Sequence, residues 1–554
     1  MSSNINQRIR RIALVCQLLL LACTATLAQQ EVPFKSITYH LEMSRPASHL
    51  FEVTMQIEPG APVASFNLQM PRWSPGRYAV FDFAKNVQEV RAFAVSNCAP
   101  GEDCPPAPLP VRRMDDQTWR VEMRGGQRVN VTYKVFADDL SGTFSQLDER
   151  HADFNGGSLF MYVVDHKQDP VSLSIAPPAR WRIINGRTES LDQRVWQFPN
   201  YDIMIDTPTE IGPDWTMDQF QVDGKTYRVV VHSFGNEGGK RQELVRGIER
   251  IVRAETAMWG APEFDSYTFL LHFAPGATGG DGMEHLTSTQ IVQAGALAYP
   301  GLLERALGTI AHEFFHVWNV KRLRPVELGP WDFTRPLSTR SLWIAEGLTN
   351  YYGTLMLRRA GLTTDEQLIR SFSETINRVE NSPGSHLMSA EEASLSAPFL
   401  DRAVHVQRTN LANTAISYYI KGEVLGLALD LTIRGKTQGR VSLDDVMRRM
   451  YDEFYIKGQN NSYYLRGRGY TGEDFERVAS ETAGFNLHDF FERYVRGTEM
   501  PPYDEALASV GLRLVRENRP GQNHVEYHIE DAQVLSHPAL TLRRSWLNGS
   551  PLQP

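Results

Sequence analysis

Residues 310–316 read Ile-Ala-His-Glu-Phe-Phe-His, the most informative stretch of the sequence. Apolar residues recur at helical spacing from residue 303 to residue 317, which predicts an amphipathic helix. Residues four apart lie on one face of a helix, so His312 and His316 can present both imidazoles to one metal ion. Glu313 projects about 100° around the axis from His312, where its carboxylate can accept a proton from water. The alternative is a helix with two surface histidines and no metal.

Zinc held by two histidines needs a third protein ligand and an open position for water. A second helical segment, residues 339–360, carries Glu346 in a largely apolar stretch, far enough after His316 for the chain to turn back. Burying an unpaired carboxylate is costly, and a metal ion relieves that cost. The spacing leaves His285 open as a different third ligand. Asn350, one turn after Glu346, is expected either to hydrogen-bond a ligating histidine or to be a surface amide.

Composition and charge limit the class of protein. The chain has 554 residues, of which 42% are hydrophobic and 22% charged, which is typical of a globular protein with several domains. This composition excludes a disordered, collagen-like or disulfide-scaffold protein. The formal net charge of −8 argues against a nucleic-acid partner.

The pattern of apolar residues divides the chain into three parts after the N-terminal region. Residues 29–222 consist of short alternating segments, which predict an N-terminal β domain of the sandwich type. Residues 223–500 predict a mixed sheet, with strands at 227–234 and 267–273 and a helix at 241–259, followed by a helical bundle. Residues 501–554 are too few for an independent domain of ordinary size. The predicted fold class is therefore α+β and multidomain.

Residues 1–28 have the features of a signal peptide, with three arginines before a short apolar run and Ala28 at the expected cleavage site. The run is shorter than the ~20 residues that a membrane-spanning helix needs. We therefore expect export to the periplasm or the medium. A variant of this expectation is a lipid tether on Cys23, because the residues before it resemble a lipobox.

Cleavage after Ala28 would leave only Cys98 and Cys104 in the mature chain. They lie in a proline-rich stretch and can close a small loop by a disulfide in an oxidising compartment. Two unpaired surface thiols are the alternative.

Several motifs together resemble the glycyl aminopeptidase family of gluzincin metallopeptidases. The motifs are HEFFHVWNVKRLRP at 312–325, LWIAEGLTNYYG at 342–353, PRWSPGRY at 71–78, DTPTEIG at 206–212 and SYYIKG at 417–422. The resemblance implies a thermolysin-like catalytic domain that binds one catalytic zinc ion. It further implies that His312, His316 and Glu346 are the zinc ligands and that Glu313 is the general base.

The same resemblance implies the residues that contact substrate. Gly282, Met283 and Glu284 resemble a glycine-rich edge strand whose glutamate holds the free α-ammonium of a peptide, although Asp281 stands where related enzymes have glycine. Tyr419 is implied as the donor to the oxyanion, with Tyr418 as the alternative if the register slips by one residue. The expected activity is removal of small N-terminal residues, Gly or Ala, from peptides.

Two other functions remain open from the sequence. One is a zinc endopeptidase in which Glu284 only lines a groove, and the other is an inactive envelope protein that binds peptides. The family commonly carries a C-terminal PDZ domain, and the roughly fifty residues after Pro501 are fewer than this fold needs. We therefore expect functions that depend on such a domain to be lacking.

Overall fold

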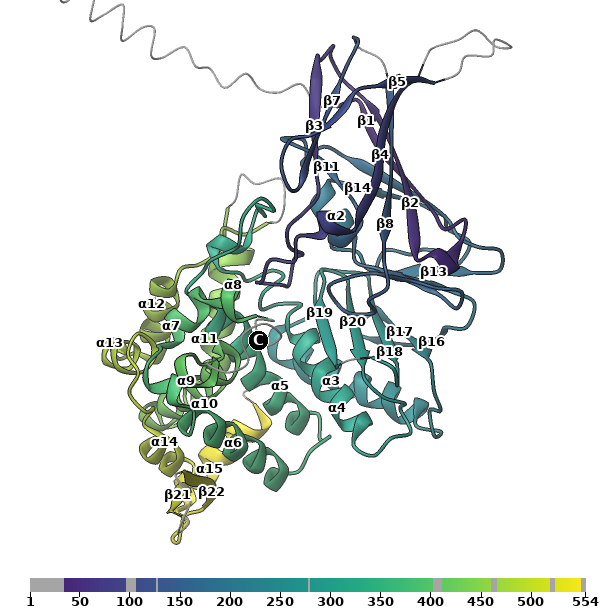
Figure 1. Ribbon diagram of the computed structural model, residues 1–554. Helices are drawn as coiled ribbons and strands as arrows, with labels where there is room; N and C mark the ends of the chain where they lie inside the picture. The colour runs from purple at the N-terminus through teal and green to yellow at the C-terminus, as the bar shows by residue number, and fades with distance from the viewer. Residues whose placement is uncertain are drawn as a thin grey trace, which may run out of the picture.

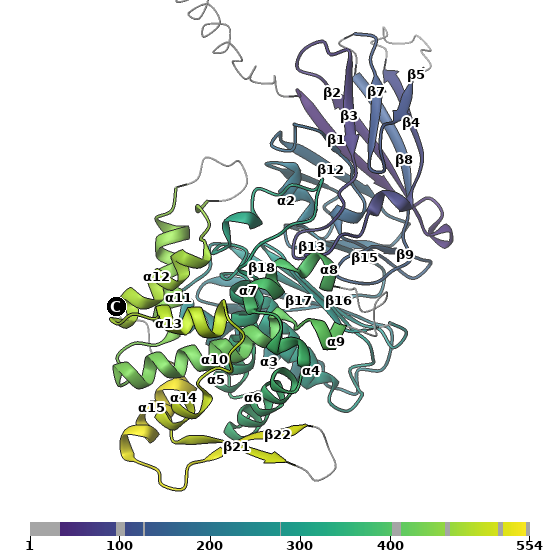
Figure 2. The ribbon, with the colours of Figure 1, turned by 60° about the vertical axis from the view of Figure 1, so that its left-hand side comes forward.

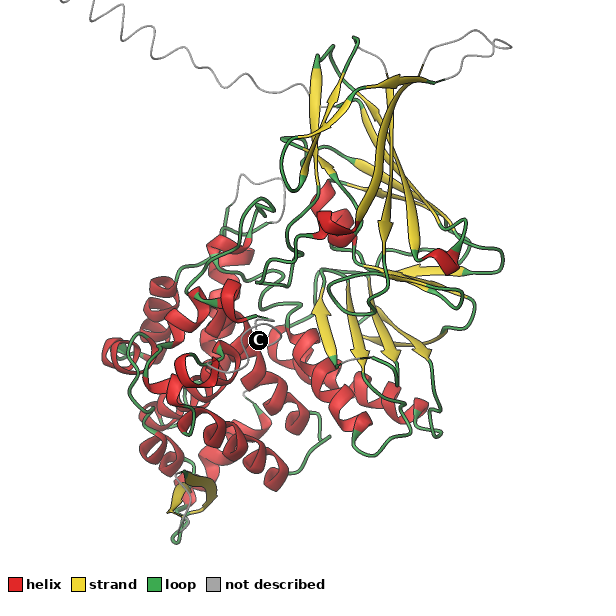
Figure 3. Ribbon diagram, in the orientation of Figure 1, coloured by secondary structure: helices red, strands yellow, loops and turns green. Residues whose placement is uncertain are grey.

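The computed structural model describes residues 34–95, 106–125, 128–277, 279–401, 411–459, 466–518 and 524–549. The predicted signal peptide, the lipid tether at Cys23 and the disulfide between Cys98 and Cys104 lie outside these residues. Within these ranges, no helix combines the length and the apolar content needed to span a bilayer. Figure 3 shows most of the strands gathered in one half of the molecule and most of the helices in the other, with one short hairpin at the far end of the helical half.

The N-terminal half contains two sheets that share one apolar core. The strands of the larger sheet are, in spatial order, β14 (Val195–Phe198), β12 (Val171–Ala176), β1 (Ser36–Glu42), β2 (Leu50–Glu58), β8 (Arg128–Phe136), β4 (Val87–Val95) and β5 (Ala107–Leu109). Those of the smaller sheet are β11 (Tyr162–Val163), β3 (Ser65–Gln69), β7 (Thr118–Glu122) and β6 (Val111–Arg113). Buried and partly exposed residues alternate along β2 and β8, because successive side chains point to opposite faces of a strand.

A third sheet connects this sandwich to the catalytic half (Figure 1). Its strands are β13 (Arg182–Asn185), β15 (Thr209–Gly212), β10 (Ala152–Phe154) and β9 (Gln146–Leu147). Ile184 on β13 and nearby Trp215 pack against Val230 and Leu270 of the catalytic sheet, so a small apolar core lies between the two halves. The helix α2 (Tyr201–Ile205) precedes β15 and is capped at its N-terminus by Asn200, whose side chain accepts a hydrogen bond from the backbone N–H of Ile203.

The catalytic half begins with a mixed sheet. Its strands are, in order, β16 (Thr216–Val222), β17 (Lys225–Ser233), β18 (Ser266–Phe273), β20 (Ser288–Gln293) and β19 (Asp281–Glu284). The three inner strands are parallel, and β19 pairs antiparallel with β20 at the edge nearest the helical part (Figure 1). The helices α3 (Arg241–Trp259) and α4 (Leu302–Phe315) belong to the same apolar core as this sheet. The sheet therefore offers α4 a fixed support and leaves β19 with a strand neighbour on one side only.

The helical part follows α4 and packs around a long central helix, α10 (Figure 2). It contains a π-helical turn (Trp343–Gly347), α5 (Leu348–Arg359), α6 (Asp365–Glu380), α7 (Ala390–Leu395), α8 (Ala397–Leu400), α9 (Leu411–Thr414), α10 (Tyr418–Thr437), α11 (Leu443–Tyr451), α12 (Gly472–Ala483) and α13 (His488–Phe490). The π-helical turn contacts α10 at two glycines. A Cβ on Gly347 would lie 2.4 Å from the Cα of Gly422, so only glycine permits this close approach.

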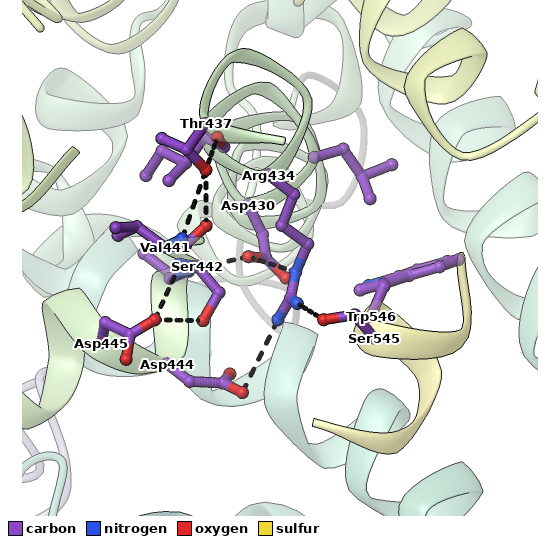
Figure 4. A network of polar contacts seen from close by, with 12 residues as sticks. Asp430, Arg434, Thr437, Val441, Ser442, Asp444, Asp445, Ser545 and Trp546 are labelled. Atoms are coloured by element: carbon purple, nitrogen blue, oxygen red, sulfur yellow. Dashed lines mark hydrogen bonds and ion pairs between the residues drawn. The ribbon is translucent and has the colours of Figure 1, made fainter. Parts of the chain in front are cut away.

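The C-terminal segment packs onto the helical part. It forms α14 (Tyr503–Ser509), the hairpin β21 (Leu512–Asn518) and β22 (Val525–Asp531), and α15 (His537–Asn548). Buried Arg434 of α10 donates to Asp430 at 3.0 Å and to Ser545 of α15 at 3.1 Å, and lies 3.6 Å from Asp444 (Figure 4). This buried network fastens α15 to α10 and α11. The predicted α+β fold class, an N-terminal sheet domain followed by a mixed sheet and a helical bundle, is confirmed.

Candidate metal centre and active site

Three side chains converge where α4 meets the π-helical turn. The Nε2 atoms of His312 and His316 are 3.0 Å apart, and Oε2 of Glu346 lies 3.3 and 3.4 Å from them. Tetrahedral zinc with bonds of ~2.0–2.1 Å places neighbouring ligand atoms roughly 3.3 Å apart. The distances and the donor set therefore fit a zinc ion that retains one open position. The helical spacing predicted the histidine pair, and the π-helical turn adds Glu346.

The electrostatics of these three groups favour a positive charge between them. Burial opposes ionisation of Glu346, but the two imidazoles hold the pKa of its carboxyl well below the usual value. Burial lowers the pKa of His316, yet the charge of Glu346 prevails and raises that pKa to about 10. A divalent cation at this point would supply the charge that the carboxylate attracts.

His316 is oriented by the backbone just beyond α4. Its Nδ1 donates a hydrogen bond of 2.6 Å to the carbonyl of Asn319, which leaves Nε2 as the ligand atom. The side chain of Asn319 donates to the carbonyl of Ile344 at 3.0 Å and so connects the end of α4 to the π-helical turn. Among the described residues, half-buried Asn350 makes no hydrogen bond to either imidazole. The sequence interpretation missed Asn319, although it lies only three residues after His316.

Tyr78, from the N-terminal domain, also reaches the metal centre. Its hydroxyl donates a 2.5 Å hydrogen bond to Oε1 of Glu346, while Oε2 of the same carboxylate faces the histidines. The residue belongs to the PRWSPGRY motif, which signalled the family resemblance without indicating a role for the tyrosine. The carboxylate of Glu346 thus accepts a hydrogen bond from the N-terminal domain through one oxygen and faces the histidines of the catalytic half through the other.

Glu313 lies beside the centre and against strand β19. One of its oxygens would be 2.1 Å from a Cβ at position 282, so Gly282 leaves the space that this carboxylate occupies. Glu313, Glu284 and His316 form one buried group whose ligand atoms lie within 4.8 Å of one another. Burial raises the pKa of Glu313 well above its usual value, and although His316 opposes this shift, the charges of Glu284 and Glu346 add to it.

Glu284 is buried at the end of β19, under a loop of the N-terminal domain. A Cβ on Gly76, which has φ +84°, would lie 2.2 Å from the sulfur of Met283 and 2.8 Å from Oε2 of Glu284. The next residue, Arg77, pairs with Asp281 and donates to the carbonyl of Gly282 at 3.2 Å. The aspartate at position 281 therefore has a partner in this chain.

The two candidate tyrosines on α10 differ in their surroundings. Tyr418 is buried, and its hydroxyl donates to the carboxylate of Asp401 at 3.0 Å. Tyr419 is half-buried, with its ring centroid 6.1 Å from that of His312. Burial raises the pKa of the Tyr419 hydroxyl well above its usual value, and nearby Glu346 adds to the shift, so this group stays protonated. Tyr419 therefore lies beside His312 with a protonated hydroxyl, whereas the hydroxyl of Tyr418 is engaged by Asp401.

His285, the alternative third ligand, belongs to a different cluster. Its Nδ1 lies 3.1 Å from Asp206, which also accepts a 2.8 Å hydrogen bond from Lys321. The motif DTPTEIG supplies this aspartate, and the cluster joins β19 to the segment after α4. Glu346, and not His285, contacts the histidine pair.

Comparisons with known proteins give the family of the chain. Residues 38–213 match the Peptidase M61 N-terminal domain, and residues 305–425 match the M61 glycyl aminopeptidase domain, so the two matches together span more than half of the chain. No curated protein sequence matches the chain.

Two solved structures show the same architecture. An aminopeptidase N family protein from Idiomarina loihiensis is 25% identical, with a TM-score of 0.77 over 88% of this chain and 80% of that one. A variant of the M1 zinc metallopeptidase from Deinococcus radiodurans is 13% identical, with a TM-score of 0.50 over 86% of this chain and 96% of that one. At this lower identity the likeness shows the fold alone. The chain belongs to the M61 glycyl aminopeptidase family and is an aminopeptidase-type zinc hydrolase.

Proposed function

We propose that the protein is an exported aminopeptidase that removes small N-terminal residues, Gly or Ala, from peptides. The observation that carries this proposal is the position of Glu284. This carboxylate is buried within 4.8 Å of both Glu313 and His316 and lies at the end of a strand with a free edge. A fixed carboxylate at this point attracts the α-ammonium of a peptide and sets its distance from the metal centre.

The residues around the centre divide the chemistry of peptide hydrolysis among them. Zinc held by His312, His316 and Glu346 would polarise the scissile carbonyl and lower the pKa of water. Glu313 accepts a proton from the attacking water and delivers it to the leaving amine. The hydroxyl of Tyr419 donates a hydrogen bond to the oxyanion that develops on the carbonyl oxygen.

The preference for small residues rests on the space beside Glu284. A cavity of about 20 Å³ lies there, lined by aromatic and apolar side chains that include Trp73, Tyr78 and Trp331, and by the cationic side chains of Arg77, Lys321 and Arg324. This volume is about that of a single methyl group or water molecule. We expect a glycine or alanine side chain to fit and a leucine or phenylalanine side chain to be excluded.

The first experiment compares a free-amino substrate with its blocked form. We expect the zinc-loaded protein to hydrolyse Ala-Ala-Phe-amide and to leave N-acetyl-Ala-Ala-Phe-amide intact, as followed by mass spectrometry. Equal cleavage of both would instead support the endopeptidase, and binding of both without cleavage would support the inactive peptide-binding protein. Leu-Ala-Phe-amide tests the size limit, because efficient removal of leucine would contradict the small pocket.

The second experiment separates binding of the α-ammonium from proton transfer. Glu284→Gln is expected to raise KM for the free peptide more than it lowers kcat, because the amide no longer attracts a cation. Glu313→Gln is expected to lower kcat by roughly 10²–10⁴-fold with zinc retained. Zinc content by mass spectrometry is the control for both variants, and undiminished turnover by Glu313→Gln would overturn its role as base.

Export rests on residues 1–28 alone. The intact mass of protein recovered from the cell envelope is expected to correspond to a chain that begins after Ala28. A chain that begins at Cys23 with an added acyl mass would indicate a lipid tether, and a full-length chain would contradict cleavage.

A further inference from the structure

A second cluster of potential metal ligands lies between the N-terminal and catalytic halves. His151, Glu210, His232 and His272 are all buried, and their ligand atoms lie within 4.8 Å of one another. None of the four belongs to the catalytic centre described above. Burial of charged and polar groups costs free energy of desolvation, so such a concentration outside the active site needs a physical reason.

The topology of two facing sheets brings these residues together. His232 on β17 and His272 on β18 are register partners on neighbouring parallel strands, so their side chains share one face of the catalytic sheet. On the third sheet, Glu210 of β15 is paired with Asp153 of β10. His151 lies two residues before Asp153 and therefore points the same way.

The cluster continues the apolar contact between the two sheets. Val230 and Leu270 of that contact precede His232 and His272 by two residues on the same strands, and Ile184 is the register partner of Glu210. The histidines and the glutamate thus lie at the end of this apolar contact, beside the buried and hydrogen-bonded pair Asp153 and Gln290.

Two of the histidines contact the carboxylate directly. Nδ1 of His232 lies 2.8 Å from Oε1 of Glu210, and Nε2 of His272 lies 2.8 Å from Oε2. Burial raises the pKa of Glu210, but the three neighbouring imidazoles prevail and hold it well below the usual value. Glu210 is therefore an anionic centre with histidine nitrogens around it.

The third histidine is not explained by hydrogen bonding. Nε2 of His151 donates a hydrogen bond of 2.9 Å to the side-chain oxygen of Gln146. Nδ1 of the neutral ring therefore carries no proton, and its lone pair is available to a metal ion. That Nδ1 is fully buried, has no hydrogen-bond partner among the described residues, and lies 3.6 Å from Oε2 of Glu210. Nδ1 of His151 and Oε2 of Glu210 are both electron-rich, and a cation bound between them would account for their close approach. A hydrogen bond from the opposite ring nitrogen is also the usual arrangement for a histidine that ligates a metal.

We propose that His151, Glu210, His232 and His272 bind a second divalent metal ion, Zn²⁺, which joins the two halves of the protein. Three imidazoles and one carboxylate make up a four-ligand set of the type that zinc prefers. All four positions come from protein, so this site has no open position for water or substrate. Its role is structural, and it does not depend on the proposed substrate of the catalytic centre.

The experiment counts zinc in a variant that lacks the catalytic site. The full chain with His312→Ala and His316→Ala keeps the second cluster intact, and we expect it to retain one zinc ion per chain by mass spectrometry. The unsubstituted protein is expected to hold two. Zero zinc in the double variant, or one in the unsubstituted protein, would overturn the proposal. The result does not depend on the folding of any variant of the second cluster.

Two further measurements place the ion. Adding His272→Gln to the double variant is expected to remove the remaining zinc, whereas His40→Gln, a histidine of β1 outside the cluster, is expected to leave it. Chelation is expected to lower the Tm of the double variant and to leave the Tm of the triple variant unchanged. Equal zinc content after His272→Gln would show that the ion binds elsewhere and would contradict the site. Anomalous diffraction at the zinc edge gives a third check, with a peak expected between His232 and His272.

Discussion

Glu313 and Gly282 show how closely the active site depends on single atoms. The carboxylate of Glu313 occupies the position that a side chain at residue 282 would fill. Strand β19 can therefore approach the metal centre only because it carries glycine there. A small change on β19 should displace the proposed base without touching a metal ligand.

Gly282→Ala tests this contact. The added Cβ would be 2.1 Å from Oε1 of Glu313, so either the carboxylate or the strand must shift. We expect kcat to fall by 10²-fold or more, because general base catalysis contributes roughly 10²–10⁴-fold. Steady-state kinetics with a free-amino peptide measures the effect.

Gly279→Ala is the matched control, because nothing lies within 4 Å of a Cβ at that position. It should retain near-normal kcat and zinc content. Full activity in Gly282→Ala would show that β19 can yield without moving the base, and would contradict the fixed position of Glu313.

Residue spacing predicted part of this site and missed the rest. The positions of His312 and His316 follow from the repeat of one helix, so a sequence is enough to place them on one face. Asn319 and Tyr78 act through contacts that no local repeat encodes. Tyr78 in particular lies 268 residues from its partner Glu346, and only the folded chain brings them together.

At the scale of elements, long periodic segments were predictable and short strands were not. The helix predicted at 241–259 is α3 with the same bounds, and the strands predicted at 227–234 and 267–273 are β17 and β18 to within two residues. The third sheet was missed. Its strands have two to four residues, too few for an alternating pattern, and long-range pairing forms them.

The helix α3 carries a carboxylate that its own amphipathic pattern does not require. Glu255 is fully buried, and within the described residues neither of its oxygens has a hydrogen-bond partner. Burial raises the pKa of its carboxyl well above the usual 4.5. In the unfolded chain the group ionises near 4.5, so the folded state loses relative stability as the pH rises above that value.

Glu255→Gln should remove this pH-dependent loss. We compare the free energies of unfolding of the two proteins. We expect the value for the unsubstituted protein to fall relative to that of the variant between pH 5 and pH 8. The change is ~1.4 kcal/mol for each unit by which the folded pKa exceeds the unfolded one. Urea unfolding at several pH values measures the difference. Glu249→Gln is the control, because Glu249 lies on the same helix but pairs with Arg253 near the surface, and it should leave the pH dependence of the free energy of unfolding unchanged. The same pH dependence in Glu255→Gln and the unsubstituted protein would contradict the burial argument.

At the scale of the whole molecule, the N-terminal domain takes part in the metal centre. The loop of residues 71–78 covers Glu284 with Gly76, pairs Arg77 with β19 and places Tyr78 on Glu346. The metal centre therefore depends on the relative position of two domains as well as on the helices that supply its ligands.

Tyr78→Phe tests this dependence. The substitution removes the hydrogen bond to Oε1 of Glu346 and preserves the packing of the ring. Loss of such an outer partner typically weakens metal affinity by about 10–100-fold, and we expect the Kd for zinc to rise by this factor. Competition with a chelating dye measures it. Tyr299→Phe, which alters a half-exposed ring, is the control and should leave the Kd for zinc unchanged. An unchanged Kd in Tyr78→Phe would show that Glu346 holds its position without this hydrogen bond and would contradict the prediction.

Because one loop of the first domain reaches a predicted zinc ligand of the second, we expect neither half to be inherited, exchanged or engineered as a self-sufficient unit. A fragment that began at residue 223 would keep every predicted ligand and the predicted base. It would lack Tyr78, which hydrogen-bonds Glu346, and the loop around Gly76 that covers Glu284. Recombination between relatives should therefore succeed only when the loop and the catalytic half come from the same parent.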